Sequence, residues 1–175
     1  MRLEKLKGGG ALPPRANRVQ VLRGFVGGTA GIVLLAYLGQ WSGLPWLMAP
    51  FGATCVLLFA VPGSPLAQPR NVIGGHLLTC VVGLVLLYSF GQAPWVLAVG
   101  VGAGIALMQL LHVVHPPAGA NPLVVILLGT AHIDASFLLT PVLTGSVGLI
   151  LIAAIVNNIG QQSRWPMYWL GKRAD

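Results

Sequence analysis

The sequence predicts an all-α membrane protein in which six apolar segments form two inverted repeats of three. Of the 175 residues, 55% are hydrophobic and only 7% are charged, and the mean hydropathy is +0.82. One small soluble core could not bury so many apolar residues. A short motif also occurs twice, first as Pro50-Phe51-Gly52-Ala53-Thr54 and then as Pro117-Ala118-Gly119-Ala120-Asn121. We interpret the two copies as half-helix starts that face one site.

Positive charge is concentrated at the two ends of the chain. Six of the ten Lys and Arg residues lie within the first 23 positions, three lie at position 164 or later, and only Arg70 lies between. Such basic flanks are typical of cytoplasmic tails, and they favour a topology signal over nucleic-acid binding. We therefore expect a basic cytoplasmic tail at 1–18, a single transmembrane domain at 19–160 and a cytoplasmic C-terminal tail at 161–175. The expected location is the bacterial inner membrane.

Both halves of the membrane domain are expected to follow the order long, broken, long. The first repeat, at about 19–90, has spans at 19–39 and 72–90 around a broken segment at 44–61; the second, at about 94–160, has spans at 95–114 and 137–159 around a broken segment at 115–129. Prolines leave the second segment a reliable helix only at 52–60, too short to cross a bilayer alone. Paired short segments interrupted by Gly and Pro are the best sequence pointer to a transporter binding site.

Two spacing patterns indicate helix faces. Glycines four residues apart would let the first span pack closely against its neighbours, and the pairs are Gly24 with Gly28 and Gly27 with Gly31. In the fourth span, Gln109 and His112 are three residues apart, so we expect both side chains on one face of that helix.

The position of Arg70 distinguishes two topologies. If all six segments cross the membrane, Arg70 lies on the same side as both termini and the second half is inverted relative to the first. If the two broken segments are re-entrant, Arg70 lies outside and the halves are parallel. Because basic loops prefer the cytoplasmic side, we favour six crossings with breaks before Gly52 and Gly119.

The residues expected inside the membrane are polar but uncharged, since Asp134, in a loop at 130–136, is the only carboxylate between Ile73 and Ile159. Helix N-termini and histidines suit a small anion better than a cation. The expected substrate-binding residues are Gly52, Ala53, Thr54, His115, Gly119, Ala120 and Asn121. A possible pathway or gate is formed by Arg70, Asn71, His76, Gln109 and His112. No catalytic residue, cofactor or metal is expected.

Several of these residues have alternative interpretations. Thr54 and Asn121 could simply cap the half-helices, the histidines could be packing residues, and Arg70 could be only a topology signal. His112 and His115 could bind a metal, although two histidines without a carboxylate or thiolate are a weak metal signal. Cys55 and Cys80 are expected to be small buried hydrophobic residues rather than disulfide partners.

The segment His115-Pro116-Pro117 resembles the signature of the HPP family of small integral membrane proteins. The resemblance extends to residues 49–54, 64–71 and 74–76 and covers about 18–158. Members that resemble this chain are associated with nitrite transport, so the resemblance implies a nitrite-like substrate. The family is often described with four membrane spans, fewer than the six segments expected here.

Three functions therefore compete. The leading hypothesis is a transporter or channel for a small inorganic anion bound between the two half-helix N-termini near the bilayer midplane, and the resemblance implies that this anion is nitrite. The protein would act in the lipid bilayer, with a homo-oligomer as a possible assembly. The second is a histidine-dependent intramembrane enzyme or metal-binding protein. The third is a membrane scaffold that does not transport, which the glycine-rich faces would suit.

Overall fold

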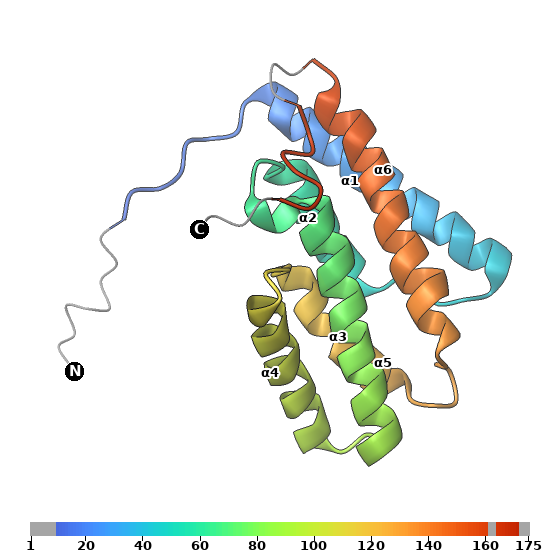
Figure 1. The fold of residues 1–175 in the computed structure, drawn as a ribbon. Helices are drawn as coiled ribbons and strands as arrows, with labels where there is room; N and C mark the ends of the chain where they lie inside the picture. Colours follow the sequence, from blue (N-terminus) through green and yellow to red (C-terminus); the bar gives the residue numbers. More distant parts are fainter. Residues whose placement is uncertain (1–9, 161–163, 172–175) are drawn as a thin grey trace.

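The computed structural model describes residues 10–160 and 164–171, and the regular elements in these ranges are helices (Figure 1). In chain order they are α1 (Arg18–Ser42), α2 (Ala49–Ala60), the short η2 (Pro65–Ala67), α3 (Pro69–Phe90), α4 (Pro94–Leu110), η3 (Pro116–Ala120), α5 (Asn121–Leu128), the π-helical η4 (Leu138–Thr144) and α6 (Gly145–Asn158). The predicted all-α membrane class is confirmed. The expected tails lie partly outside the described residues, at 1–9, 161–163 and 172–175.

Three of the helical segments are long and apolar enough to cross a bilayer: Arg18–Ser42, Pro69–Phe90 and the continuous Leu138–Asn158. The three others, Ala49–Ala60, Pro94–Leu110 and Pro116–Leu128, are apolar but shorter. At about 1.5 Å per residue, the shorter segments extend roughly 18 to 26 Å. The chain is therefore a multi-pass membrane protein with the order long, short, long, short, short, long.

Helix α3 lies at the centre of the bundle, where it contacts α4, α5, α6 and η3 (Figure 1). Helix α1 packs against α2 and α6. Successive helices alternate in direction, so that α1 and α3 begin, and α2 and α6 end, toward one end of the bundle (Figure 1). The α3–α4 turn and the α5–α6 loop lie toward the opposite end.

Glycines allow two of these close helix contacts. A Cβ at Gly27 would stand 2.2 Å from the ring of Phe59, and one at Gly31 would stand 2.8 Å from Leu149. This pair therefore has the packing role that its spacing predicts. The other pair, Gly24 and Gly28, has no neighbouring atom within 4 Å, so its predicted role in packing within this chain is wrong.

Three boundary predictions are also wrong. Helix α2 begins at Ala49 rather than at Gly52, because Pro50 occupies an early helical position where its missing N–H costs nothing. In the second broken segment the helical turn continues through Gly119, and the α-helix begins at Asn121. Helix α4 ends at Leu110, several residues before the predicted end of the fourth span.

Candidate functional site

The two copies of the repeated motif meet at one histidine in the centre of the bundle. His76 projects from α3, and its side chain is completely buried. Its Nε2 atom lies 2.8 Å from the Thr54 hydroxyl of α2, and its Nδ1 atom lies 3.0 Å from the Asn121 side-chain amide nitrogen of α5. The last residue of each motif copy therefore contacts one of the two ring nitrogens of His76.

A second buried histidine extends this cluster. His115 Nε2 lies 2.9 Å from the same Thr54 hydroxyl, and His115 Nδ1 lies 2.7 Å from the backbone carbonyl oxygen of Leu66 in η2. The two imidazole rings have centroids 5.0 Å apart. We call Thr54, His76, His115 and Asn121 the histidine cluster; it joins α2, α3 and the start of the second broken segment.

Only one arrangement of protons in the neutral cluster gives all four ring nitrogens of the two histidines a hydrogen-bond partner. The carbonyl of Leu66 can only accept, so His115 carries its proton on Nδ1 and accepts at Nε2 from the Thr54 hydroxyl. That hydroxyl in turn accepts from His76 Nε2. His76 Nδ1 is then an acceptor for the Asn121 amide, which donates to it. All the donors therefore point in one direction, from Asn121 towards Leu66.

The local sequence places His115 in this position. Pro116 disfavours a helical conformation at the residue before it, and His115 is extended, with φ −138° and ψ 99°. The extended segment passes close to α3 because α3 has glycines there. A Cβ at Gly74 would stand 2.8 Å from Val113, and one at Gly75 would stand 2.8 Å from the Cβ of His115. The Gly-Gly-His sequence of α3 thus presents His76 and makes room for His115.

A groove lies beside the histidine cluster, between the first turns of the two broken segments. Its volume is about 530 Å³, and it is lined by Ala49, Pro50, Ala53, Leu57, Pro116, Pro117 and Ala120. A neighbouring groove of about 440 Å³ shares Pro116 and Ala120 and also contacts Gln109 and Gly119. Of the predicted small residues, Ala53, Gly119 and Ala120 therefore line these grooves, whereas Gly52 lines neither. Thr54 and Asn121 are buried.

Arg70 and Asn71 hold loops together near the start of α3. Arg70 donates to the backbone carbonyl oxygens of Leu111 and Leu170. Asn71 donates to the carbonyl of Val114 at 2.9 Å. These contacts fix the segment that leads to His115, but they do not bring either side chain into the histidine cluster.

Two predicted pathway residues lie away from the cluster. Gln109 and His112 are both exposed, and His112 lies in a turn beyond α4 with φ +55°. They do not share a helix face, so that prediction is wrong. A left-handed conformation is uncommon outside glycine, although histidine adopts it more often than most residues.

The capping interpretation of the two motif residues is also wrong. The N-cap positions of α2 and α5 are Met48 and Ala120, and neither side chain caps its helix. Thr54 instead lies beyond the first turn of α2 and donates to, or accepts from, groups within the histidine cluster.

The groups proposed for metal or thiol chemistry do not gather in this structure. Among the described residues, no three His, Cys, Asp or Glu side chains form a group that could hold a metal ion. His112 is exposed whereas His115 is buried, so the two do not form a common site. Cys55 and Cys80 are buried free cysteines, as expected for small apolar residues.

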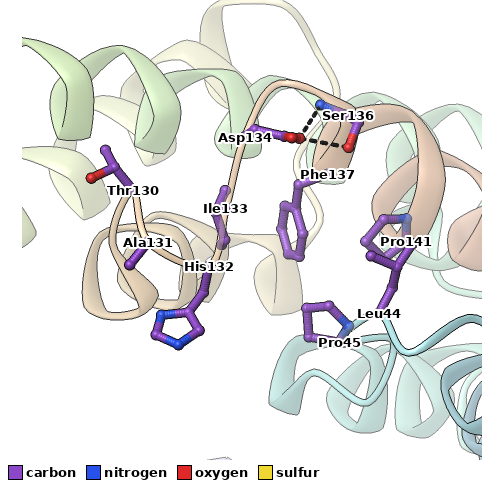
Figure 2. A pocket seen from close by; sticks show the side chains of 10 residues that line it. All are labelled: Leu44, Pro45, Thr130, Ala131, His132, Ile133, Asp134, Ser136, Phe137 and Pro141. Atoms are coloured by element: carbon purple, nitrogen blue, oxygen red, sulfur yellow. Dashed lines mark hydrogen bonds between the residues drawn. The ribbon is translucent and has the colours of Figure 1, made fainter.

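A polar pocket at the α5–α6 loop contains Asp134, the only carboxylate among the described residues (Figure 2). The Ser136 hydroxyl and backbone N–H both donate to the Asp134 carboxylate, and they hold its pKa below the ordinary value. His132 points away from Asp134 in the same pocket (Figure 2). The side chains of His132, Asp134 and Ser136 therefore do not form a nucleophile arrangement in this structure.

Three contacts of the cluster were not predicted from the sequence. The ring of Phe51 packs against His76 with centroids 5.0 Å apart, and the Thr79 hydroxyl accepts from Asn121 at 3.0 Å. The third is the Leu66 carbonyl. Thr79 could have been found, because it follows His76 by three residues on the same helix face; a backbone carbonyl in a loop gives no such signal.

The transmembrane-region pattern of the HPP family matches residues 13–166. The chain belongs to the HPP family. Two transmembrane proteins of Dictyostelium discoideum are similar to it: one is 32% identical over 95% of this chain and 56% of its own length, the other 34% identical over 90% of this chain and 58% of its own length. The chain thus spans somewhat more than half the length of these curated relatives. No solved structure matches it.

In this HPP-family chain, the His-Pro-Pro segment has a clear structural role. The first proline keeps His115 extended so that its ring reaches Thr54 and Leu66, and both prolines line the groove beside the cluster. The resemblance and the geometry therefore indicate the same few residues.

Proposed function

We propose that this protein transports a small inorganic anion across the membrane, with nitrite the first candidate because of the family resemblance. The observation that carries the proposal is the groove between the first turns of α2 and η3, whose inner wall adjoins the histidine cluster. Both short helices start at this groove, from separate halves of the chain. Transport, rather than enzymatic conversion, is the function that two such facing helix starts favour.

The charges near the groove support an anion. The N-terminal end of a helix carries partial positive charge, and two such ends border the groove. The described residues of the helices contain no Asp or Glu, since Asp134 lies in the α5–α6 loop. The two buried imidazoles can add positive charge but cannot add negative charge. A cation in the same groove would therefore be disfavoured.

The packing pattern supports two inverted repeats. If α1 is exchanged with α4, α2 with α5 and α3 with α6, each of three helix contacts has a counterpart. The α1–α2 contact corresponds to α4–α5, α1–α6 corresponds to α4–α3, and α2–α6 corresponds to α5–α3. Buried glycines obey the same exchange: Gly27 and Gly31 of α1 face α2 and α6, whereas Gly100 and Gly104 of α4 face α5 and α3. The alternating helix directions make the second half inverted relative to the first, which suits alternating access to a shared site.

The distribution of charge supports a cytoplasmic location for both termini. Arg18 begins α1 and Arg70 lies in the first turn of α3. Both helices start toward one end of the bundle, whereas the α5–α6 loop, which contains Asp134, lies toward the other (Figure 1). Arg70 also binds the tail that follows α6 through the carbonyl of Leu170. Because basic residues remain on the cytoplasmic side, we assign that end to the cytoplasm of a bacterial inner membrane.

Purified protein reconstituted in liposomes tests the proposal. Nitrite flux should exceed the flux in protein-free liposomes, and nitrate, formate and chloride added as competitors should rank the accepted anions. Nitrite recovered unchanged supports transport, whereas its chemical conversion would favour the enzyme hypothesis. Flux equal to that of protein-free liposomes for all four anions would overturn the proposal.

Groove-filling variants locate the pathway. Ala53→Phe and Ala120→Phe place a ring in the groove and should remove most of the flux. Ala98→Phe is the matched control, because Ala98 is exposed on α4 and lines neither groove. If all three variants transport equally, the anion does not pass through this groove.

A further inference from the structure

We propose that His115 is a reversible binding site for one proton, that the Thr54 hydroxyl switches its hydrogen bond when the proton binds, and that proton and anion are transported together. The last part rests on the proposed function, whereas the first two parts concern the histidine cluster alone. The inference follows from the three hydrogen-bond partners of Thr54, which its hydroxyl cannot all satisfy while the cluster is neutral.

The Thr54 hydroxyl has three close partners but only one proton. Its oxygen lies 2.8 Å from His76 Nε2, 2.9 Å from His115 Nε2 and 3.0 Å from the backbone carbonyl oxygen of Pro50. The Pro50 carbonyl can only accept. In the neutral cluster the hydroxyl proton is needed by His115 Nε2, so Thr54 does not donate to Pro50. In the neutral state the Pro50 carbonyl therefore accepts no hydrogen bond from Thr54 and remains available as an acceptor.

Addition of one proton brings the Pro50 carbonyl into the hydrogen-bond network without breaking the cluster. A proton from water binds His115 Nε2, which becomes a donor to the Thr54 oxygen. The hydroxyl proton of Thr54 then rotates to the Pro50 carbonyl, while His76 Nε2 continues to donate to the second lone pair of the Thr54 oxygen. His115 Nδ1 still donates to Leu66. Only one O–H rotates, and no hydrogen-bonding group in the cluster loses its partner.

His76 has no equivalent second state. Its vacant Nδ1 faces the amide nitrogen of Asn121 at 3.0 Å, and the two N–H groups of that nitrogen are shared among Nδ1, the His76 carbonyl and the Thr79 hydroxyl. The amide oxygen of Asn121 is farther away, at 3.4 Å. A proton on Nδ1 would place two donors against each other. The geometry thus assigns the additional proton to His115 and makes Asn121 the residue that keeps His76 neutral.

Few charged groups surround His115 from the described elements. The other histidine of the cluster, His76, has its ring centroid 5.0 Å from that of His115. Arg70 lies at the start of α3, where its guanidinium binds the Leu111 and Leu170 carbonyls. Tyr168 of the tail donates to Pro65 and Asn71. The helices, turns and tail around the cluster that the structure describes contain no carboxylate. A protonated His115 therefore needs a negative charge from outside the chain.

The groove can supply that charge as a bound anion. Pro50 and Pro116 both line the groove. The carbonyl of Pro50 accepts the hydrogen bond from Thr54 in the protonated state, and Pro116 directly follows His115. An anion in the groove would stabilise the imidazolium, and the imidazolium would attract the anion. Linkage makes this effect reciprocal, so each ligand strengthens the binding of the other by the same factor.

Nitrogen NMR of protein labelled with ¹⁵N-histidine tests the proton site directly, without a transport measurement. The four histidines are assigned with His→Gln variants at each position. At pH 8 we expect the Nδ1–H tautomer for His115 and the Nε2–H tautomer for His76. On acidification in the presence of nitrite, His115 should become doubly protonated while His76 keeps its tautomer.

Variants of Thr54 test the switch. Thr54→Val keeps the shape but removes the hydroxyl, so His115 should no longer take up the second proton over the pH range where the wild type does. Thr54→Ser restores a hydroxyl and should restore uptake. Ser146→Ala is the matched control. Ser146 is a buried hydroxyl that donates to the Val142 carbonyl of η4, outside the histidine cluster, so His115 in this variant should titrate as in the wild type. Unchanged His115 titration in Thr54→Val, or protonation of His76 first, would overturn the proposal.

Coupling is tested in liposomes with an imposed pH gradient and a pH dye inside. Nitrite entry should carry one proton per anion in excess of protein-free liposomes, which measure the leak of nitrous acid. His115→Gln should move nitrite without the protein-dependent proton. If wild-type flux is independent of the gradient while the NMR titration is as expected, the coupling is refuted and the proton site stands. If no anion is transported at all, the proposed function fails and coupling fails with it.

Discussion

Gly75 is the position at which one added methyl group should disturb the histidine cluster most. A Cβ there would stand 2.8 Å from the Cβ of His115, 3.1 Å from the carbonyl oxygen of Val113 and 3.4 Å from Ala118. Because ordinary contacts begin near 3.4 Å, the His115 segment must move by about 0.6 Å in Gly75→Ala. Overpacking of this kind costs roughly 1–3 kcal/mol. All three neighbours are Cβ or backbone atoms that cannot rotate away.

The matched control is Gly102→Ala in α4. Both positions are helical, so both variants gain roughly 1 kcal/mol of helix propensity, but Gly102 has no neighbouring atom within 4 Å. Gly75→Ala should therefore be less stable than Gly102→Ala by about 1–3 kcal/mol in reversible unfolding from detergent micelles. The ¹⁵N signal of His115 should shift only in Gly75→Ala. Equal stability of the two variants would refute the close approach of α3 to His115.

Three other results are expected. Thr54→Val and Asn121→Leu should each reduce nitrite flux at least several-fold while the protein remains folded by circular dichroism, because each leaves a ring nitrogen of His76 without its partner; full transport in both would make these residues dispensable. A cysteine that replaces Arg70 should be labelled from the cytoplasmic side, and labelling only from the other side would refute six crossings. Ser136→Ala should raise the pKa of Asp134, as followed by carbonyl NMR, because the hydroxyl donor is lost. Since the folded-state pKa is lowered, the loop contact stabilises the protein above the unfolded-state pKa and is lost as pH falls through the folded value.

The sequence could predict which residues belong together, but not the atoms through which they interact. The repeated motif marked Thr54 and Asn121, and both reach the same buried cluster. Their shared partner, His76, was predicted only as a pathway residue, because periodicity along one helix does not determine how that helix is rotated against its neighbours. The Leu66 carbonyl that sets the tautomer of His115 could not be predicted, since any residue supplies the same backbone group.

The errors have equally local causes. Pro116 accounts for the extended His115 but not for the end of α4 five residues earlier, so Gln109 and His112 were placed on a helix face that does not exist. The early start of α2 follows from the tolerance of helices for proline in the first turn. Hydropathy alone predicts neither the early end of α4 nor the early start of α2.

The tail beyond α6 has a mechanical consequence. Met167 binds Gln68, Tyr168 binds Pro65 and Leu170 binds Arg70, so residues 167–170 are tied to the loop before α3 and to the first turn of α3. These contacts join the two halves at one end of the bundle. If one half rocks against the other during transport, the motion must pivot at that end, and its amplitude must grow toward the end that contains the α5–α6 loop. Such a motion would open the end with the α5–α6 loop widely, while the end where residues 167–170 are bound would scarcely move.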